Sequence, residues 1–368
     1  MGFLLPPLLL HFCLRQVSYI LLELNYANPL PIYIYNMRCT AATTTSSSYS
    51  SSSSSSNAFR RCRRHLHLQQ KQQTLLRPQK RSVVANAKNW RHAAAFSAAE
   101  ENEDDEDVEF ALDEGEFIVE AFDTEEELSA ALCLEVFENA KACIEDRGSF
   151  SLAIPGGSVA KALKGLVELD DGGLDWSKMH VFFVNERPEE QKCYNLARKT
   201  WVDEFVSQGK FKLENLHKVS ENAEDLERVA KEYEEQMFAL AQDEVLPRDE
   251  YTKAPVFDLI LLGMGADGHV GSIYPNSPQA KDENISTNVF AVDMPGKRTI
   301  SMSLHLINQA DRVVVAATGA GKAETVKKAL EGDLEFGELP GAMVDAFSTI
   351  WFLDLAAASK LSSVQDDQ

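Results

Sequence analysis

The 368-residue sequence has few cysteines, and those it has do not cluster. Only three of its six cysteines lie beyond residue 90, namely Cys133, Cys143 and Cys193. None belongs to a CxxC pair or stands near a histidine in a metal-ligand spacing, so the sequence predicts neither a disulfide framework nor a structural zinc site. We expect a fold without a metal, in a reducing compartment.

Long hydrophobic runs are also missing. The longest uncharged stretches of the leading region, Met1–Leu14 and Leu24–Met37, are short and contain prolines. A transmembrane helix needs about 20 consecutive apolar residues. We therefore predict no membrane span and no membrane partner.

Acidic residues are nearly absent from the first quarter of the chain. Residues 1–90 contain 11 Lys/Arg and the single acid Glu23, whereas the remainder carries 25 basic and 56 acidic residues. Such an acidic body lacks the basic face that nucleic-acid binding requires, so no nucleic-acid partner is expected. The expected partner is a small molecule, and an anionic one needs a local basic pocket.

The basic leader has the composition of a targeting segment. The tract Ser46–Ser56 is followed by an arginine-rich stretch, and a Ser-rich, Arg-rich, acid-poor pattern is typical of an organelle transit peptide. A poly-Ser tract buries too little apolar surface to offset its ordering entropy. We predict a disordered leader over residues 1–85, with Met37 as a hypothetical true start and a processing site near Val84–Ala87.

Beyond the leader, an acidic linker is predicted over residues 86–115 and a single domain over residues 116–368. In this body, apolar runs such as FIVEAF (117–122), FDLILL (257–262), NVFAVDM (288–294), TISMSL (299–304) and TIWFLD (349–354) predict strands. Among the predicted helices, one is capped by Thr124 and runs through Asp146, and another covers residues 159–169. Strands separated by helices form right-handed crossovers and a largely parallel sheet, giving an α/β fold. Ligands of such sheets bind beyond the carboxyl ends of the strands, so the loops there are the candidate site.

The segment GMGADGHVGS, residues 263–272, follows FDLILL and contains a G-x-G-x-x-G frame. A dinucleotide fingerprint needs a helix that starts within this loop, and Pro275 would interrupt that helix. Asp267 and His269 within the glycine frame indicate side-chain chemistry instead of backbone contact with a pyrophosphate. A dinucleotide site and a purely structural tight turn remain alternatives on this motif alone.

The segment IPGGS, residues 154–158, ends one strand and opens a helix. Gly156 and Gly157 leave backbone N–H groups unobstructed, and Ser158 can cap the helix. Together these features predict an anion site at a helix N-terminus. A plain strand–helix turn explains the same residues equally well.

Three basic side chains also lie near strand ends. Arg187, in Asn185-Glu-Arg, can bind a phosphate or form a surface ion pair with Glu186 or Glu189. Arg298 precedes a strand and Lys322 follows one, and each is either a phosphate ligand or a solvated side chain. Lys322 is not in a P-loop, because that motif's earlier glycine and its Ser/Thr are both replaced by alanine.

Taken in order, GGS, NER, GMGADGH with Ser272, and a late P…RT with GAGKA resemble 6-phosphogluconolactonase over residues 117–361. DWSKMHVFF is similar to plant-type members. The resemblance implies a Rossmann-like fold shared with glucosamine-6-phosphate deaminases. It also implies hydrolysis of 6-phospho-D-glucono-1,5-lactone to 6-phosphogluconate in the oxidative pentose phosphate pathway, without metal or organic cofactor. A chloroplast-stromal enzyme, monomeric or a weak homo-oligomer, is expected.

The resemblance also implies residue roles. His269 would be the general base that activates water, with Asp267 orienting it. A sugar phosphate would be held by seven residues: Gly156, Gly157, Ser158, Asn185, Arg187, Arg298 and Lys322. His180, His217 and His305 are interpreted as structural or surface residues, and Cys193 as a small packed side chain.

Two departures from the family pattern affect these roles. Asn185 stands where the family has Asp, and Cys193 where it has Asn. Asn cannot carry negative charge or accept a proton as Asp does, which weakens the amino-sugar phosphate deaminase alternative. A catalytically weak sugar-phosphate-binding or scaffold protein of the plastid remains the alternative from another class.

Overall fold

The computed structural model describes residues 81–86, 116–281 and 287–362. The poly-Ser leader up to residue 80, the hypothetical start at Met37 and linker residues 87–115 lie outside this part. No helix within the described residues combines the length and apolar character that crossing a membrane requires.

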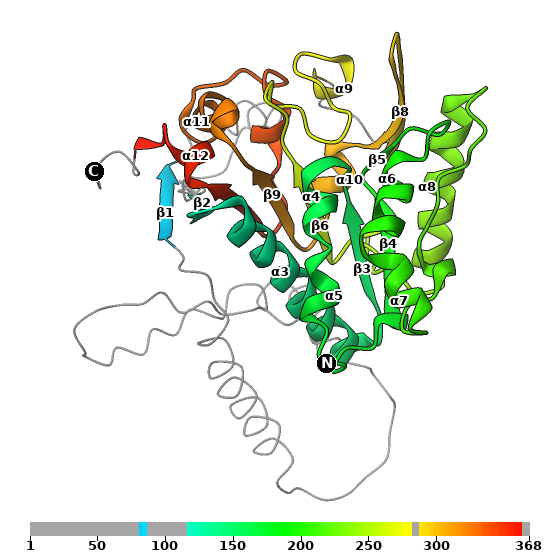
Figure 1. Cartoon of the computed structure of the whole chain (residues 1–368). Coiled ribbons are helices and arrows are strands. Elements are labelled where there is room, and N and C mark those ends of the chain that lie inside the picture. Colours follow the sequence, from blue (N-terminus) through cyan, green and yellow to red (C-terminus); the bar gives the residue numbers. More distant parts are fainter. Residues whose placement is uncertain (1–80, 87–115, 282–286, 363–368) are drawn as a thin grey trace, which may run out of the picture. The chain divides into compact units, whose positions relative to one another are not determined.

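A seven-stranded sheet organises the described part of the chain (Figure 1). All neighbouring strands are parallel except the edge pair β1–β2, which confirms the predicted largely parallel α/β sheet. In spatial order the strands are β1 (Arg81–Asn86), β2 (Glu116–Phe122), β10 (Thr349–Asp354), β9 (Val313–Ala317), β6 (Leu259–Gly263), β3 (Phe150–Ile154) and β4 (Met179–Phe183).

Helices cover both faces of this sheet, because its central strands are apolar on both sides. In β6, Leu259 and Leu261 pack on one face while Ile260 and Leu262 pack on the other. The first face is covered by α3 (Glu125–Arg147), α4 (Gly157–Ala162), α5 (Gly165–Leu169), α6 (Lys192–Ala197) and α7 (Asp203–Ser207). The second is covered by α8 (Leu226–Gln242), α9 (Pro278–Lys281), α10 (Leu304–Asn308), α11 (Ala323–Glu331) and α12 (Leu355–Ala358).

Strand β1 corrects the predicted end of the disordered leader. Residues 81–85 were assigned to that leader, yet Arg81–Asn86 pairs along its whole length with β2. Two β-branched residues, Val83 and Val84, favour an extended backbone there, and the exposed edge of β2 supplies the hydrogen-bonding partners. The predicted processing site near Val84–Ala87 therefore overlaps a strand of the sheet.

Two predicted elements differ in detail. The helix expected over residues 159–169 is two short helices, α4 and α5, separated by a turn at Leu163 and Lys164. At Gly165, which begins α5, a Cβ would lie 3.0 Å from the Sγ of Cys133. The strands near residues 290 and 300 leave the main sheet. They form the antiparallel hairpin β7 (Val289–Met294) and β8 (Lys297–Met302), joined by β5 (Asn185–Glu186), because the turn between them is too short for a crossover.

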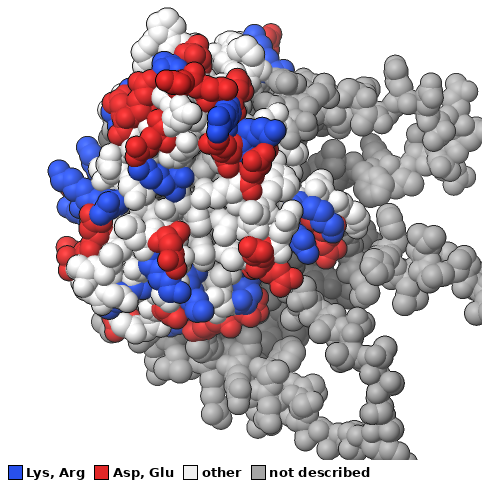
Figure 2. All heavy atoms as spheres, turned by 90° about the vertical axis from the view of Figure 1, so that its right-hand side faces the viewer, with Lys and Arg blue, Asp and Glu red and all other residues white. Residues whose placement is uncertain are grey.

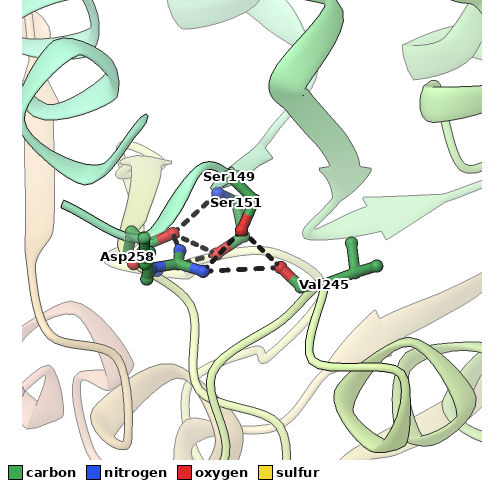
Figure 3. A network of polar contacts seen from close by, with 5 residues as sticks. Ser149, Ser151, Val245 and Asp258 are labelled. Carbon is green, nitrogen blue, oxygen red and sulfur yellow. Dashed lines mark hydrogen bonds and ion pairs between the residues drawn. The ribbon is translucent and has the colours of Figure 1, made fainter. Parts of the chain in front are cut away.

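A buried polar network lies at the amino ends of β3 and β6, away from the candidate loops (Figure 3). The carboxylate of Asp258, 5% exposed, accepts hydrogen bonds from the backbone N–H and the hydroxyl of Ser151, each at 2.7 Å, and pairs with Arg147. Arg147 also donates to Ser149, whose hydroxyl donates to the carbonyl of Val245 at 3.1 Å. The network joins the end of α3 to two central strands.

The first prediction concerns this network. Asp258→Ala should lower the free energy of unfolding by about 3 kcal/mol, because it leaves Arg147 and Ser151 without their shared buried partner. Urea unfolding measures this loss, with the exposed Asp243→Ala as the matched control. A loss no larger than that of the control would contradict the structural role of Asp258.

A pair of histidines joins β4 to the segment beside it, because His180 belongs to β4 and the N–H of His217 donates to the carbonyl of Val181 in the same strand. The Nδ1 of His180 and the Nε2 of His217 lie 3.0 Å apart, and the His217 ring stacks on Phe182 at 4.2 Å. Burial, with nearby positive charge, lowers the pKa of His180 to about 4, and burial with the neighbouring His180 lowers the pKa of His217 to about 3. The pair is therefore neutral near pH 7, and its burial favours the structural interpretation of these histidines over the surface one.

The second prediction follows from these pKa values. Below pH 6.5 the unfolded chain protonates both histidines while the folded chain does not, so stability is complete above pH 6.5 and falls as pH drops toward 4. Each histidine contributes up to about 1.4 kcal/mol per pH unit. Urea unfolding at several pH values in this range gives the free energy of unfolding as a function of pH. This free energy should fall less steeply with decreasing pH in His217→Gln than in the wild type or in His305→Gln. Identical slopes would show that the pair does not titrate on unfolding.

Candidate active site

The four predicted loops lie along one edge of the sheet. Strands β9, β6, β3 and β4 are consecutive neighbours and parallel, so their carboxyl ends meet at the same edge. The loops that follow them contain IPGGS, Asn185–Arg187, GMGADGHVGS and Gly319–Lys322. Side-chain and backbone contacts then connect several of these loops directly.

The loop after β6 is a tight turn that presents His269. The N–H of Gly265 donates to the carbonyl of His269 at 2.8 Å, and the N–H of Gly268 donates to the carbonyl of Gly265 at 3.0 Å. Gly268 has a φ of +89°, which a residue with a side chain rarely adopts, and a Cβ there would lie 2.6 Å from the Cγ of buried Leu339. The glycines therefore serve the turn itself.

This geometry does not fit the dinucleotide alternative. A Cβ on Gly265 would overlap the imidazole of His269, so the histidine covers the backbone that a pyrophosphate would approach. No helix starts in the loop. The next described helix is α9, which begins at Pro278, after the interruption predicted at Pro275.

Asp267 holds the histidine ring in one orientation. Its Oδ1 lies 2.5 Å from the Nδ1 of His269 and also accepts the backbone N–H of His269 at 3.2 Å. Burial works to raise the pKa of the Asp267 carboxyl, but the hydrogen bonds from His269 outweigh it and lower that pKa. Since Nδ1 is engaged, Nε2 is the nitrogen left for chemistry, on a side chain that is 34% exposed.

Two other segments fix the turn from outside. The hydroxyl of Thr325, at the start of α11, donates to the carbonyl of Ala266 at 2.6 Å. The N–H of Gly341 donates to the carbonyl of Gly268 at 2.9 Å. Neither contact could be predicted from the sequence, because both partners lie more than 50 residues beyond the turn.

Asn185 lies in a polar chain that connects β5 to the histidine loop. Its Nδ2 donates to the Oγ of Ser272 at 3.1 Å, and Ser272, 2% exposed, also accepts from Thr299 at 3.0 Å. The N–H of Ser272 donates to Ser301 at 3.0 Å. The amide of Asn185 thus preserves a connection between loops although it cannot act as a base.

Glu186 lies within the candidate site, and we predicted for it only a surface ion pair with Arg187. It is 1% exposed, and its carboxylate accepts the backbone N–H groups of Arg187, Cys193 and Tyr194 at 2.8–3.1 Å. Burial raises the pKa of its carboxyl against these hydrogen bonds. Glu186 therefore anchors the first turn of α6 to the strand end that carries Arg187, a role that depends on burial and could not be read from the sequence.

The IPGGS loop departs from prediction in one respect. Gly156, not Ser158, is the N-cap of α4, and Ser158 is exposed in the first turn without a capping hydrogen bond. Gly157 has a φ of +71° and starts the helix two residues before the expected start at Val159, which moves Ser158 past the cap. A Cβ on Gly156 would lie 2.9 Å from the Sγ of Cys193, so the packed role predicted for Cys193 is confirmed, and burial raises the pKa of its thiol.

The three predicted cations differ in their partners. Arg187 pairs with Glu190 rather than with Glu186 or Glu189, and Arg298 pairs with Glu189. The Nζ of Lys322 makes no hydrogen bond or ion pair within the described residues, and burial lowers its pKa although nearby carboxylates oppose the shift. Lys322 is thus a partly buried cation, while both arginines are already matched by acids.

Comparison with known proteins agrees with this arrangement. The family model described as glucosamine-6-phosphate isomerases/6-phosphogluconolactonase matches residues 123–351. The chain belongs to this family. A rice (Oryza sativa) protein named probable 6-phosphogluconolactonase 3, chloroplastic, is 33% identical over 249 residues, which cover 66% of this chain and 76% of that one. The Arabidopsis thaliana 6-phosphogluconolactonase 3, chloroplastic, is 32% identical over 247 residues, 66% and 75% of the two chains.

Solved structures of the family share the fold. The 6-phosphogluconolactonase of Trypanosoma brucei matches with a TM-score of 0.56 and 26% identity, over 66% of this chain and 98% of that one. A monomeric glucosamine-6-phosphate deaminase matches with a TM-score of 0.51 and 20% identity, over 66% and 98%. The second likeness shows the fold alone, and it confirms the Rossmann-like architecture common to both branches of the family.

The third prediction tests the turn that carries His269. Gly268→Ala should lower the free energy of unfolding by about 2 kcal/mol, because it adds overlap with Leu339 to the strain of a positive φ. Gly296→Ala is the matched control, since Gly296 has a φ of +75° and open space around its Cβ position. Urea unfolding of both variants separates the cost of the positive φ, which both share, from the cost of the overlap with Leu339, which only Gly268→Ala has. Equal losses of unfolding free energy in the two variants would refute the packing of Leu339 against the turn.

Proposed function

We propose that this chain is a carboxylic ester hydrolase that converts 6-phospho-D-glucono-1,5-lactone to 6-phosphogluconate, a step of the oxidative pentose phosphate pathway. The observation that carries the proposal is the His269–Asp267 pair, held at the carboxyl edge of the sheet with the His269 side chain 34% exposed. The family and the names of the plant relatives supply the substrate.

In this mechanism the Nε2 of His269 removes a proton from water as its oxygen attacks the lactone carbonyl carbon. The carbonyl oxygen gains negative charge, and the bond between that carbon and the ring oxygen then breaks. The proton on His269 passes to the departing ring oxygen, which becomes the hydroxyl of the product acid. Asp267 stabilises the imidazolium that forms between these steps.

The phosphate of the substrate is assigned to the cations at the same edge. Lys322 offers a partly buried charge without a described partner, and Arg187 and Arg298 offer planar donors that match phosphate oxygens. The backbone N–H groups of Gly156 and Gly157, with Ser158, are assigned to further ligand oxygens. Every proposed step uses only side chains, backbone groups and water, so the proposed mechanism needs no cofactor.

A second candidate function rests on Asn185. Because its amide connects two loops but cannot act as a base, the chain can hold a sugar phosphate without efficient turnover. The same residue disfavours the deaminase or isomerase reaction, which requires a carboxylate base at this position. This alternative is a plastid sugar-phosphate-binding protein with weak or no catalysis.

The proposed location is the plastid, consistent with the chloroplastic names of several plant relatives. More specifically, we assign the enzyme to the stroma, reached through the basic, acid-poor leader as a transit peptide. A small sugar phosphate is the proposed partner, and the acidic body argues against nucleic acid. A monomer or a weak homo-oligomer is proposed, and sedimentation of the full chain tests it.

The fourth prediction tests catalysis. His269→Ala should lower kcat by about 10²- to 10⁴-fold, the usual contribution of a general base, in a spectrophotometric lactonase assay corrected for spontaneous hydrolysis. His305→Ala, which removes a histidine on α10, is the matched control and should retain activity. A wild-type rate equal to the spontaneous background would refute the enzymatic function.

The Asn185→Asp variant separates the two candidate functions. A large rise in kcat would place the natural chain closer to a binding protein, whereas an unchanged or lower kcat would show that the amide suits the lactonase. Calorimetry with 6-phosphogluconate, run on the same proteins, reports binding independently of turnover.

A further inference from the structure

Consecutive acids occupy both arginines assigned to the phosphate. The Nη1 of Arg187 lies 2.9 Å from Glu190, and the Nη1 of Arg298 lies 2.5 Å from Glu189. The two arginines come from different elements, the loop after β5 and the strand β8. A two-residue acidic segment therefore reaches both of them at once.

Both ion pairs belong to a larger polar cluster. Glu190 also pairs with Lys192 at 2.7 Å, so it bridges two basic side chains. Arg298 also pairs with Asp293 at 3.3 Å and donates to the carbonyl of Ala223 at 2.7 Å. Figure 2 shows the same alternation of basic and acidic side chains across one face of the molecule, with no purely basic field.

The turn that carries the acids is fixed. The N–H groups of Glu190 and Gln191 both donate to the carbonyl of Arg187, at 3.0 and 2.8 Å. The buried side-chain amide of Gln191 donates to the carbonyls of Pro188 and Val219 at 2.9 and 3.1 Å, and Gln191 has a φ of 48°. The carboxylates are thus presented to the arginines by a short, well-bonded turn.

The pairs themselves are exposed and therefore weak. The four side chains are 37–56% exposed, and ion pairs at such sites are screened by solvent and salt. A carboxylate presents two oxygens to a guanidinium much as a phosphate does, but with one negative charge rather than nearly two. A phosphate dianion can therefore displace these carboxylates, while a monoanion of similar shape gains little by doing so.

We propose that Glu189 and Glu190 are internal competitors for the substrate phosphate. They hold Arg187 and Arg298 in the free protein, are displaced when a phosphate dianion binds, and so lower the affinity of the protein for phosphate. The inference rests on the proposed function, because that function assigns the phosphate to these arginines.

The test uses the full chain and inorganic phosphate as the probe, with affinity measured by calorimetry at fixed pH and salt. Glu189→Gln and Glu190→Gln should each tighten phosphate binding by about two- to fivefold, the effect of removing one exposed ion pair. The KM for the phosphorylated lactone should fall by a similar factor.

Glu232→Gln is the matched control, because it also removes one exposed acid that pairs with an arginine, Arg228 on α8. Phosphate affinity that is unchanged, weakened, or tightened only as much as in this control would overturn the proposal. Tighter phosphate binding in a chain without lactonase activity would support the competition and refute the proposed function. Lactonase activity in the wild type, with no change of phosphate affinity in the two variants, would support the proposed function and refute the competition.

Discussion

Backbone hydrogen bonds between the parallel strands β9, β6, β3 and β4 are the constraint on which the site depends. Parallel pairing aligns the carboxyl ends of these strands, so loops separated by more than a hundred residues open at one edge. The buried Asp258 network contributes from the opposite end, because it connects the starts of β3 and β6 to α3. The hydrogen-bonded network at the amino ends of the strands thus helps to hold in place the strands that carry the candidate site at their carboxyl ends.

Backbone geometry in the turn after β6 fixes the position of His269. Gly268 adopts a left-handed conformation against Leu339, and Gly265 leaves room for the imidazole. Thr325 holds the carbonyl of Ala266 from α11. Each contact limits a different part of the turn, so the orientation of His269 does not rest on Asp267 alone.

Much of the fold was predictable from local signals. The apolar runs located β10 to the residue, and Thr124 was recognised as the cap of α3 because its capping signal is local. The same holds for the four candidate loops, which follow strands that are apolar on both faces. The division into α4 and α5 has no local signal, and Gly165, which begins α5, lies close to Cys133 of α3, a contact between residues distant in the sequence.

The parts that sequence could not supply are long-range pairings. The ion-pair partners of Arg187 and Arg298 are Glu190 and Glu189, and the turn that ends at Gln191 positions both of these acids. The role of Glu186 depends on its burial against α6. Strand β1 is a further case, since its extended form needs the edge of β2 as a partner. Because β1 covers the edge of β2, the position at which the leader is cleaved also affects the sheet. Cleavage after residue 86 would uncover the N–H and C=O groups along β2, so the choice of cut also decides whether the sheet ends in a protected strand or in an edge open to other chains.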